Sequence, residues 1–108
     1  MTLILKEFDS YTVEYFSKNG ESDTRKAIIR CFTGNSQQEV GRITFLDVKP
    51  LPDNNFHSNL IYVYFHLSLF DDIIDILRNE KPLRIYLEDY IKVGGIITSY
   101  EPIGEQEP

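Results

Sequence analysis

The sequence has few of the residues on which small disulfide-bonded or metal-binding domains depend. It contains one cysteine, Cys31, and no tryptophan. A single cysteine excludes an intramolecular disulfide and any metal site built from several cysteines. Because Cys31 lies in the apolar run 27–32, we predict a buried, unreactive thiol, which fits a reducing compartment.

Long apolar segments are also missing. No run approaches the ~20 residues that a membrane-spanning helix needs. The first residues reach the charged pair Lys6 and Glu7 too soon for a secretory signal. We therefore expect a soluble, cytoplasmic protein. Its 108 residues fit one domain, 1–108.

Basic residues are scarce, with 11 Lys and Arg against 17 Asp and Glu and a net charge of −6. Residues 1–54 hold 7 basic and 8 acidic side chains, net −1, whereas residues 55–108 hold 4 and 9, net −5. A negative field repels nucleic acids and anionic membranes, so we expect neither as a partner. It attracts a basic protein, although acidity can also serve solubility alone.

Alternation of apolar and polar residues predicts most of the secondary structure. Strand-like runs occupy 3–8, 11–16, 25–33, 40–46, 60–67, 83–88 and 90–99. One stretch, 68–79, has helical spacing instead, with Ser68 as N-cap, Asp71 and Asp72 in the first turn, and Pro82 as a stop.

The fold class predicted by this order is α+β, mainly β. We expect an antiparallel sheet or sandwich of about six strands, with one α-helix at about 68–79 before the last two strands. The first strands, joined by tight turns, predict a meander. The pattern leaves open whether the sheet stays open, splits into two layers or curls into a partial barrel.

Glycines and one long connection interrupt this pattern. Gly41, inside a strand, predicts a bulge or a close approach of two backbones. Gly94 and Gly95 predict a bend or bulge in the last strand. The connection 47–59 is long for a compact domain, as functional or mobile loops often are.

No residue constellation predicts catalysis, a cofactor or a metal. A Cys–His pair would need Cys31 beside His57 or His66, and nothing in the spacing brings them together. The adjacent acids Glu88 and Asp89 are better read as a solvated turn than as an acid–base pair. A mixed site of His66 with the helix aspartates is conceivable, but a solvated polar face explains those aspartates.

Two features do suggest an interaction surface. One face of the run 60–67 carries two tyrosines and a histidine, and the helix carries three aspartates. Cross-strand packing is the simpler role for the tyrosines, but tyrosine is also favoured at protein interfaces. The candidate surface residues are Asp71, Asp72, Asp75, Tyr62, Tyr64 and His66.

Two short segments resemble a group of small bacterial proteins without an assigned activity. The segments are Leu-Arg-Asn-Glu-Lys-Pro at 77–82 and Glu-Pro-Ile-Gly-Glu at 101–105. The resemblance implies a bacterial, cytoplasmic, stand-alone domain and covers about the last third of the chain. It implies no activity, cofactor or site residue.

Three hypotheses of function follow. The first is a small non-enzymatic protein-interaction domain, in one version an immunity- or antitoxin-like protein that blocks a basic toxin. The alternative is a small-molecule-binding domain or minor enzyme with a pocket between sheet and helix, near His57, Tyr64 and His66. The third is a homodimer that pairs through a strand edge or a tyrosine face that includes Tyr62.

Overall fold

Two sheets and one helix make up the fold, in a computed structural model that describes residues 3–17, 25–34, 38–80 and 83–98. The strands are β1 (Leu3–Phe8), β2 (Ser10–Tyr15), β3 (Arg25–Thr33), β4 (Gln38–Leu46), β5 (Asn55–His57), β6 (Leu60–His66), β7 (Leu83–Glu88) and β8 (Val93–Thr98). A 3-10 turn, η1 (Leu67–Leu69), leads into the helix α1 (Phe70–Asn79). The α+β class, its β-rich character and the single helix before the last two strands are confirmed.

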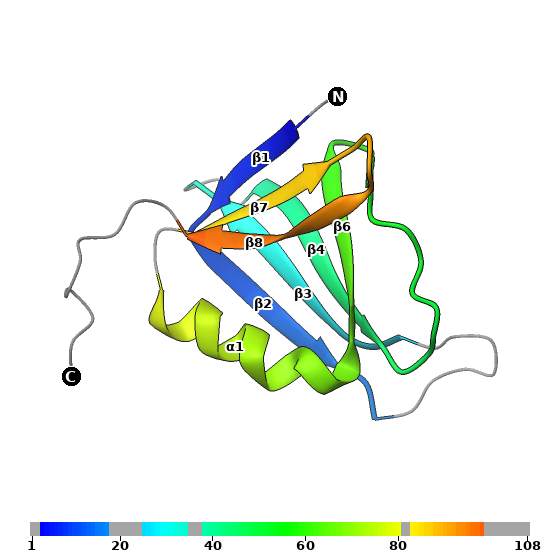
Figure 1. Ribbon diagram of the computed structural model, residues 1–108. Coiled ribbons are helices and arrows are strands. Elements are labelled where there is room, and N and C mark those ends of the chain that lie inside the picture. Colours follow the sequence, from blue (N-terminus) through cyan, green and yellow to red (C-terminus); the bar gives the residue numbers. More distant parts are fainter. Residues whose placement is uncertain (1–2, 18–24, 35–37, 81–82, 99–108) are drawn as a thin grey trace.

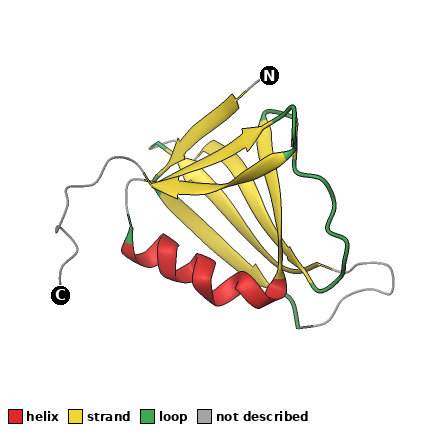
Figure 2. Ribbon diagram, in the orientation of Figure 1, coloured by secondary structure: helices red, strands yellow, loops and turns green. Residues whose placement is uncertain are grey.

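The strands form two layers (Figures 1 and 2). The larger sheet has the order β2-β3-β4-β6-β5 and the smaller one the order β1-β7-β8. Figure 1 shows the smaller sheet lying across one face of the larger, with α1 beside it. The strand count exceeds the predicted six. Among the described residues, seven strands match the strand-like runs of the sequence, and the eighth, β5, lies within the predicted 47–59 connection. Although β1 and β2 are consecutive, they belong to different sheets.

Pairing is mostly antiparallel, and the β2-β3-β4 meander is as predicted. The exception is β4 with β6, which run parallel. The chain reverses direction at a hairpin between β5 and β6, whose central residues Ser58 and Asn59 have φ of 53° and 67°. That reversal brings β6 back alongside β4 in the same direction.

Alternate residues of both sheets fill one core between them. In β7, every second residue is buried in this core, namely Leu83, Ile85 and Leu87. The helix α1 contributes Ile73 and Leu77 to the same core. Cys31 is fully buried there, and burial raises the pKa of its thiol to about 12, with Glu39 adding to the effect. The predicted buried thiol is confirmed.

The helix begins later than predicted, and Ser68 does not cap it. The N-cap residue of α1 is Leu69, which provides no side-chain hydrogen bond. Ser68 lies in η1, where its backbone N–H donates to His66 Nδ1 at 3.2 Å. Asp71 and Asp72 do occupy the first turn, and the helix ends at Asn79. The predicted stop, Pro82, and the segment 101–105 lie outside the described residues.

Rings fix the start of the helix on the larger sheet. Phe70, the first residue of α1, meets Phe45 of β4 edge-on at 5.0 Å between ring centroids. It meets Tyr15 of β2 in the same way at 5.1 Å. Such pairs contribute about 1 kcal/mol each beyond their buried area. They hold α1 on the same face of the larger sheet that the smaller sheet covers.

Glycines allow close approach of the layers. A Cβ at Gly41 would lie 2.7 Å from Ile85 Cδ1, and one at Gly94 would lie 2.8 Å from both Val63 Cγ1 and Tyr86 O. The prediction for Gly94 and Gly95 was a bend or a bulge, and the bulge is wrong, because β7 and β8 pair without a register shift. Close packing against Val63 of the larger sheet accounts for a glycine at position 94.

Candidate functional site

The candidate site lies on the face of the larger sheet that points away from α1, here called the outer face. In β6, Ile61 and Val63 enter the core, so Tyr62, Tyr64 and His66 lie on the opposite side. The charged and aromatic residues of the outer face are Glu14, Arg30, Glu39, Arg42, Tyr62, Tyr64 and His66.

A β-bulge in β4 provides the key carboxylate. Cys31 pairs with Gly41 while the next residue, Phe32, pairs with Glu39, so Val40 is an extra residue in β4. Val40 is buried in the core, and the residue before it is shifted to the opposite face. The bulge therefore places Glu39 on the outer face beside Arg42. One of the two predictions for Gly41 was a bulge and the other a close approach, and both are confirmed.

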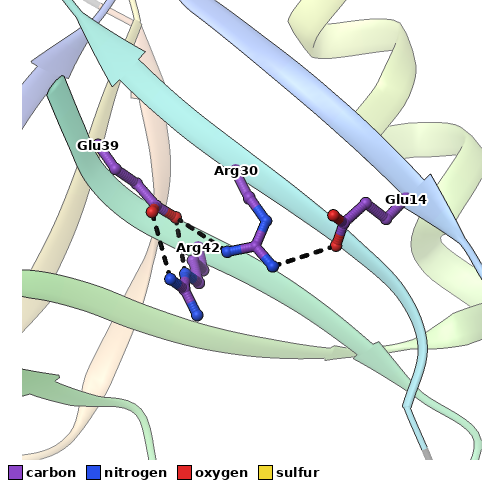
Figure 3. A network of polar contacts seen from close by, with 4 residues as sticks. All are labelled: Glu14, Arg30, Glu39 and Arg42. Atoms are coloured by element: carbon purple, nitrogen blue, oxygen red, sulfur yellow. Dashed lines mark hydrogen bonds and ion pairs between the residues drawn. The ribbon is translucent and has the colours of Figure 1, made fainter. Parts of the chain in front are cut away.

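Four residues from three strands form a continuous network (Figure 3). Arg30 and Arg42 lie directly opposite each other in the β3–β4 pair. Glu39 binds Arg42 with both oxygens, at 2.6 Å to Nε and 3.2 Å to Nη2, and lies 3.7 Å from Arg30 Nη1. On the other side, Arg30 Nη2 donates to Glu14 at 3.3 Å. Two carboxylates thus neutralise a pair of like charges that would otherwise repel.

The network continues onto β6 through an aromatic ring. The Arg42 guanidinium lies 5.7 Å from the centroid of the Tyr62 ring, within the range of a cation–π contact. The hydrogen bond that Arg42 donates to Glu39 raises the pKa of Arg42, against the opposing effect of burial. Arg42 is therefore a fixed positive charge held between a carboxylate and a ring.

His66 is held at the far end of β6. Its Nδ1 accepts the Ser68 backbone N–H at 3.2 Å and lies 3.0 Å from Ser68 Oγ. Its Nε2 lies 3.5 Å from Asp47 Oδ1. Since Nδ1 accepts the Ser68 backbone N–H, the neutral ring carries its proton on Nε2, directed to Asp47.

The structure separates the six predicted surface residues into two groups. Tyr62, Tyr64 and His66 share the outer face of β6. The aspartates of α1 are exposed on a helix that packs against the other face of the sheet. These aspartates, Asp71, Asp72 and Asp75, therefore do not share a surface with the two tyrosines.

The described residues do not bring together side chains for catalysis or for metal binding. In the part of the chain that the structure describes, no three His, Cys, Asp or Glu side chains are grouped so that they could hold a metal ion. Cys31 lies in the core, and His57 is exposed at the end of β5. Asp89 forms a weak pair with Lys92 in the β7–β8 turn, as expected of a solvated turn residue.

A pocket of about 180 Å³ lies at the C-terminal end of α1. It is not near His57, Tyr64 or His66, where the small-molecule hypothesis placed it, because those residues line the outer face and the β5 end. Its walls are Phe8, Asp9, Ser10, Tyr11, Leu77, Arg78, Glu80 and Leu83.

Comparisons of the chain with protein-family models, curated proteins and solved structures find no match. Among the described residues, no helix is long and apolar enough to cross a membrane.

Sequence reasoning missed the arginines and glutamates of the outer face. In the sequence, Glu39 and Arg42 stand three apart in a strand, a spacing that places side chains on opposite faces. The signal that could have found them is Gly41 between them, because a glycine in a strand often marks a bulge.

Proposed function

We propose that the protein is a small non-enzymatic protein-interaction domain and that the outer face of the larger sheet is its binding surface. The observation that carries the proposal is the held pair of opposed arginines, Arg30 and Arg42, next to Tyr62. Two guanidinium groups opposite each other across a strand pair destabilise a fold unless carboxylates neutralise them, so this arrangement uses Glu14 and Glu39 to hold two arginines at the surface.

Arginine and tyrosine are also the residue types that contribute most at protein interfaces. Long side chains normally lose rotamer freedom on binding, which costs about 0.5–1.5 kcal/mol each. Here Glu39 already holds Arg42 and Glu14 already holds Arg30, so these side chains lose less rotamer freedom when a partner binds. The side chains of both arginines are still 28–30% exposed and available to a partner.

The partner proposed is a basic protein. The four-residue network is neutral, so the net charge of −6 belongs to the rest of the chain and acts at long range. Such a field accelerates encounter with a basic protein, and the Arg and Tyr side chains then make the contacts. An immunity- or antitoxin-like protein of the bacterial cytoplasm, which covers a basic toxin, is the specific version of this proposal.

The test compares two variants in affinity capture from host lysate at 50 and 500 mM salt. Tyr62→Ala removes a ring from the outer face without a change in charge. The triple variant Asp71→Asn, Asp72→Asn, Asp75→Asn alters the other group of candidates. We expect a basic protein to be captured at low salt, lost with Tyr62→Ala and retained, with slower association, by the triple variant.

Other outcomes contradict the proposal at different points. If the triple variant alone loses the partner, the binding surface is the helix and the outer face is not the site. If the wild-type protein captures nothing at either salt concentration, the interaction-domain proposal itself is wrong. Circular dichroism of both variants separates loss of binding from loss of folding.

The pocket at the end of α1 supports a second candidate, a small-molecule-binding domain. Its polar walls come from Asp9, Tyr11 and Arg78, over an apolar floor that includes Leu77. A volume of about 180 Å³ suits a ligand of a few heavy atoms, below the usual size of cofactor sites. A thermal-shift screen of small polar metabolites, repeated on Arg78→Ala, tests it. A stabilising ligand that loses its effect in the variant would favour this candidate.

A further inference from the structure

The smaller sheet also has a face that no described element covers. Its inner side packs on the core, and its outer side, here called the small-sheet face, points away from it. Three large apolar side chains of this face are exposed: Leu3 by 56%, Leu5 by 41% and Val93 by 48%. In the register, Leu5 lies next to Tyr86 on the central strand β7, and Tyr86 lies next to Gly95 on β8. The centre of the face is therefore apolar and aromatic.

The charged residues of this face, Glu7, Arg84 and Glu88, have no ion-pair partner among the described residues. Arg84 lies on β7, two residues before Tyr86, and its Nε is buried with no hydrogen bond. No described carboxylate lies within ion-pair distance of it, although Glu7 is its register neighbour on β1. Because Nε is covered within the single chain, a second molecule can pair only with the two Nη groups of this guanidinium, which have no partner among the described residues.

The same strand carries a complementary charge. Glu88 lies two residues after Tyr86, so Arg84 and Glu88 stand at equal distances on either side of the tyrosine and on the same face. We propose that the small-sheet face binds a second copy of this chain, with Arg84 of each copy paired to Glu88 of the other.

A two-fold axis produces this arrangement without any other partner. Consider an axis that lies in the plane of the interface, at right angles to β7 and level with Tyr86. Rotation about it places β7 of the second copy over β7 of the first, with the two strands antiparallel. Arg84 then faces Glu88 of the second copy, and Tyr86 faces Tyr86. Such self-complementarity defines an isologous dimer. Sheets packed in this way lie ~10 Å apart, within the combined reach of Arg and Glu side chains.

The size of the face sets the expected strength. Three strands about 4.8 Å apart and five residues of about 3.3 Å cover roughly 240 Å² in projection. Stable interfaces bury about 800 Å² per partner, so we expect a weak, reversible dimer that forms at high protein concentration. This surface is separate from the outer face of the larger sheet, so the dimer does not depend on the proposed function.

Charge-reversal variants test the pairing directly in sedimentation-equilibrium experiments on the full chain. We expect wild-type protein to dimerise, and Arg84→Glu and Glu88→Arg each to weaken the dimer at least tenfold, because each places like charges opposite each other. Mixed in equal amounts, the two variants should associate again, since the carboxylate introduced in one then faces the guanidinium introduced in the other. Restoration on mixing cannot result from a folding defect.

An apolar pair of variants provides the matched control. Leu5→Glu should dissociate the dimer, whereas Leu69→Glu, at an equally exposed leucine beside α1, should leave it intact. The proposal is overturned if wild-type protein is monomeric at millimolar concentration, if the mixed variants do not associate, or if Leu69→Glu and Leu5→Glu have equal effects.

Discussion

Glu39 binds Arg42 through both carboxylate oxygens, although the two residues lie three apart on a single strand. In a regular strand they would point to opposite faces. The extra residue Val40 changes the alternation, so that an apolar side chain enters the core and a carboxylate reaches the outer face. A local backbone irregularity thus determines the chemistry of the surface proposed to bind a partner.

Removal of the Glu39 charge should destabilise the protein. Glu39→Gln leaves Arg30 and Arg42 facing each other with only Glu14 nearby. We expect a loss of about 1 kcal/mol in the free energy of unfolding, the upper range for a partly exposed ion pair. The loss should be greatest at ~0.01 M salt, where charges are least screened. Urea unfolding at two salt concentrations measures it.

Glu14→Gln is the matched control. Among the described residues Glu14 pairs with Arg30 alone, and its side chain is 43% exposed against 19% for Glu39, so its removal should cost less. A double-mutant cycle of Glu39→Gln with Arg42→Gln then isolates the pair itself. Equal stability of wild type and Glu39→Gln at low salt would show that the network does not hold the arginines in place.

Neighbouring glycines in β8 should respond differently to the same substitution. Gly94→Ala places a methyl group 2.8 Å from Val63 Cγ1 and from the backbone oxygen of Tyr86, so we expect a loss of about 1–3 kcal/mol. Gly95→Ala meets its nearest atom, Tyr86 Cε1, at 3.4 Å, an ordinary van der Waals contact, so the loss of stability should be smaller than for Gly94→Ala. Equal losses in urea unfolding would contradict the close packing of the two sheets at Gly94.

The sequence was sufficient for the fold class because the main signals are local. Alternation identified β6 and β7, and helical spacing identified α1. The sequence pattern did not reveal β5, because the turn of the β5–β6 hairpin consists of Ser58 and Asn59. These residues adopt positive φ without the glycine that usually marks such a turn. The Ser68 cap was wrong because a 3-10 turn precedes the helix, and His66 caps that turn by accepting the Ser68 backbone N–H. The parallel β4–β6 pair and the outer face depend on long-range register, which a local pattern does not contain.

Asn54 should hold the long connection to both sheets. Its Oδ1 accepts the Tyr64 backbone N–H at 2.9 Å, and its Nδ2 donates to the Lys92 carbonyl at 3.0 Å. Asn54→Ala leaves both groups unpaired, so we expect a loss of about 1–2 kcal/mol and faster hydrogen exchange at the Tyr64 amide. Asn55→Ala is the control, since the one side-chain hydrogen bond that the described residues give Asn55 is a 3.4 Å contact to the Asp53 carbonyl. Unchanged exchange at Tyr64 in Asn54→Ala would show that this bond does not protect the amide.

Cys31 should be unreactive in the folded protein. Burial raises the pKa of its thiol from 9.0 to about 12, so at a given pH below 9 the thiolate is about a thousandfold rarer than in the unfolded chain. We expect a disulfide reagent at pH 8 to label native protein only as fast as it unfolds, and to label protein in guanidinium at once. Rapid labelling of native protein would contradict the buried position.

The same raised pKa predicts how stability depends on pH. Between pH 9 and about 12 the unfolded chain loses the Cys31 proton while the folded protein keeps it, so the unfolded state binds fewer protons and stability falls as pH rises. Below pH 9 the contribution is fully present, and across the window it amounts to at most about 4 kcal/mol. Urea unfolding of wild type and Cys31→Ala from pH 8 to 10.5 should give a steeper decline for wild type. Parallel declines would mean that the thiol does not contribute, because every other ionisable group is common to both proteins.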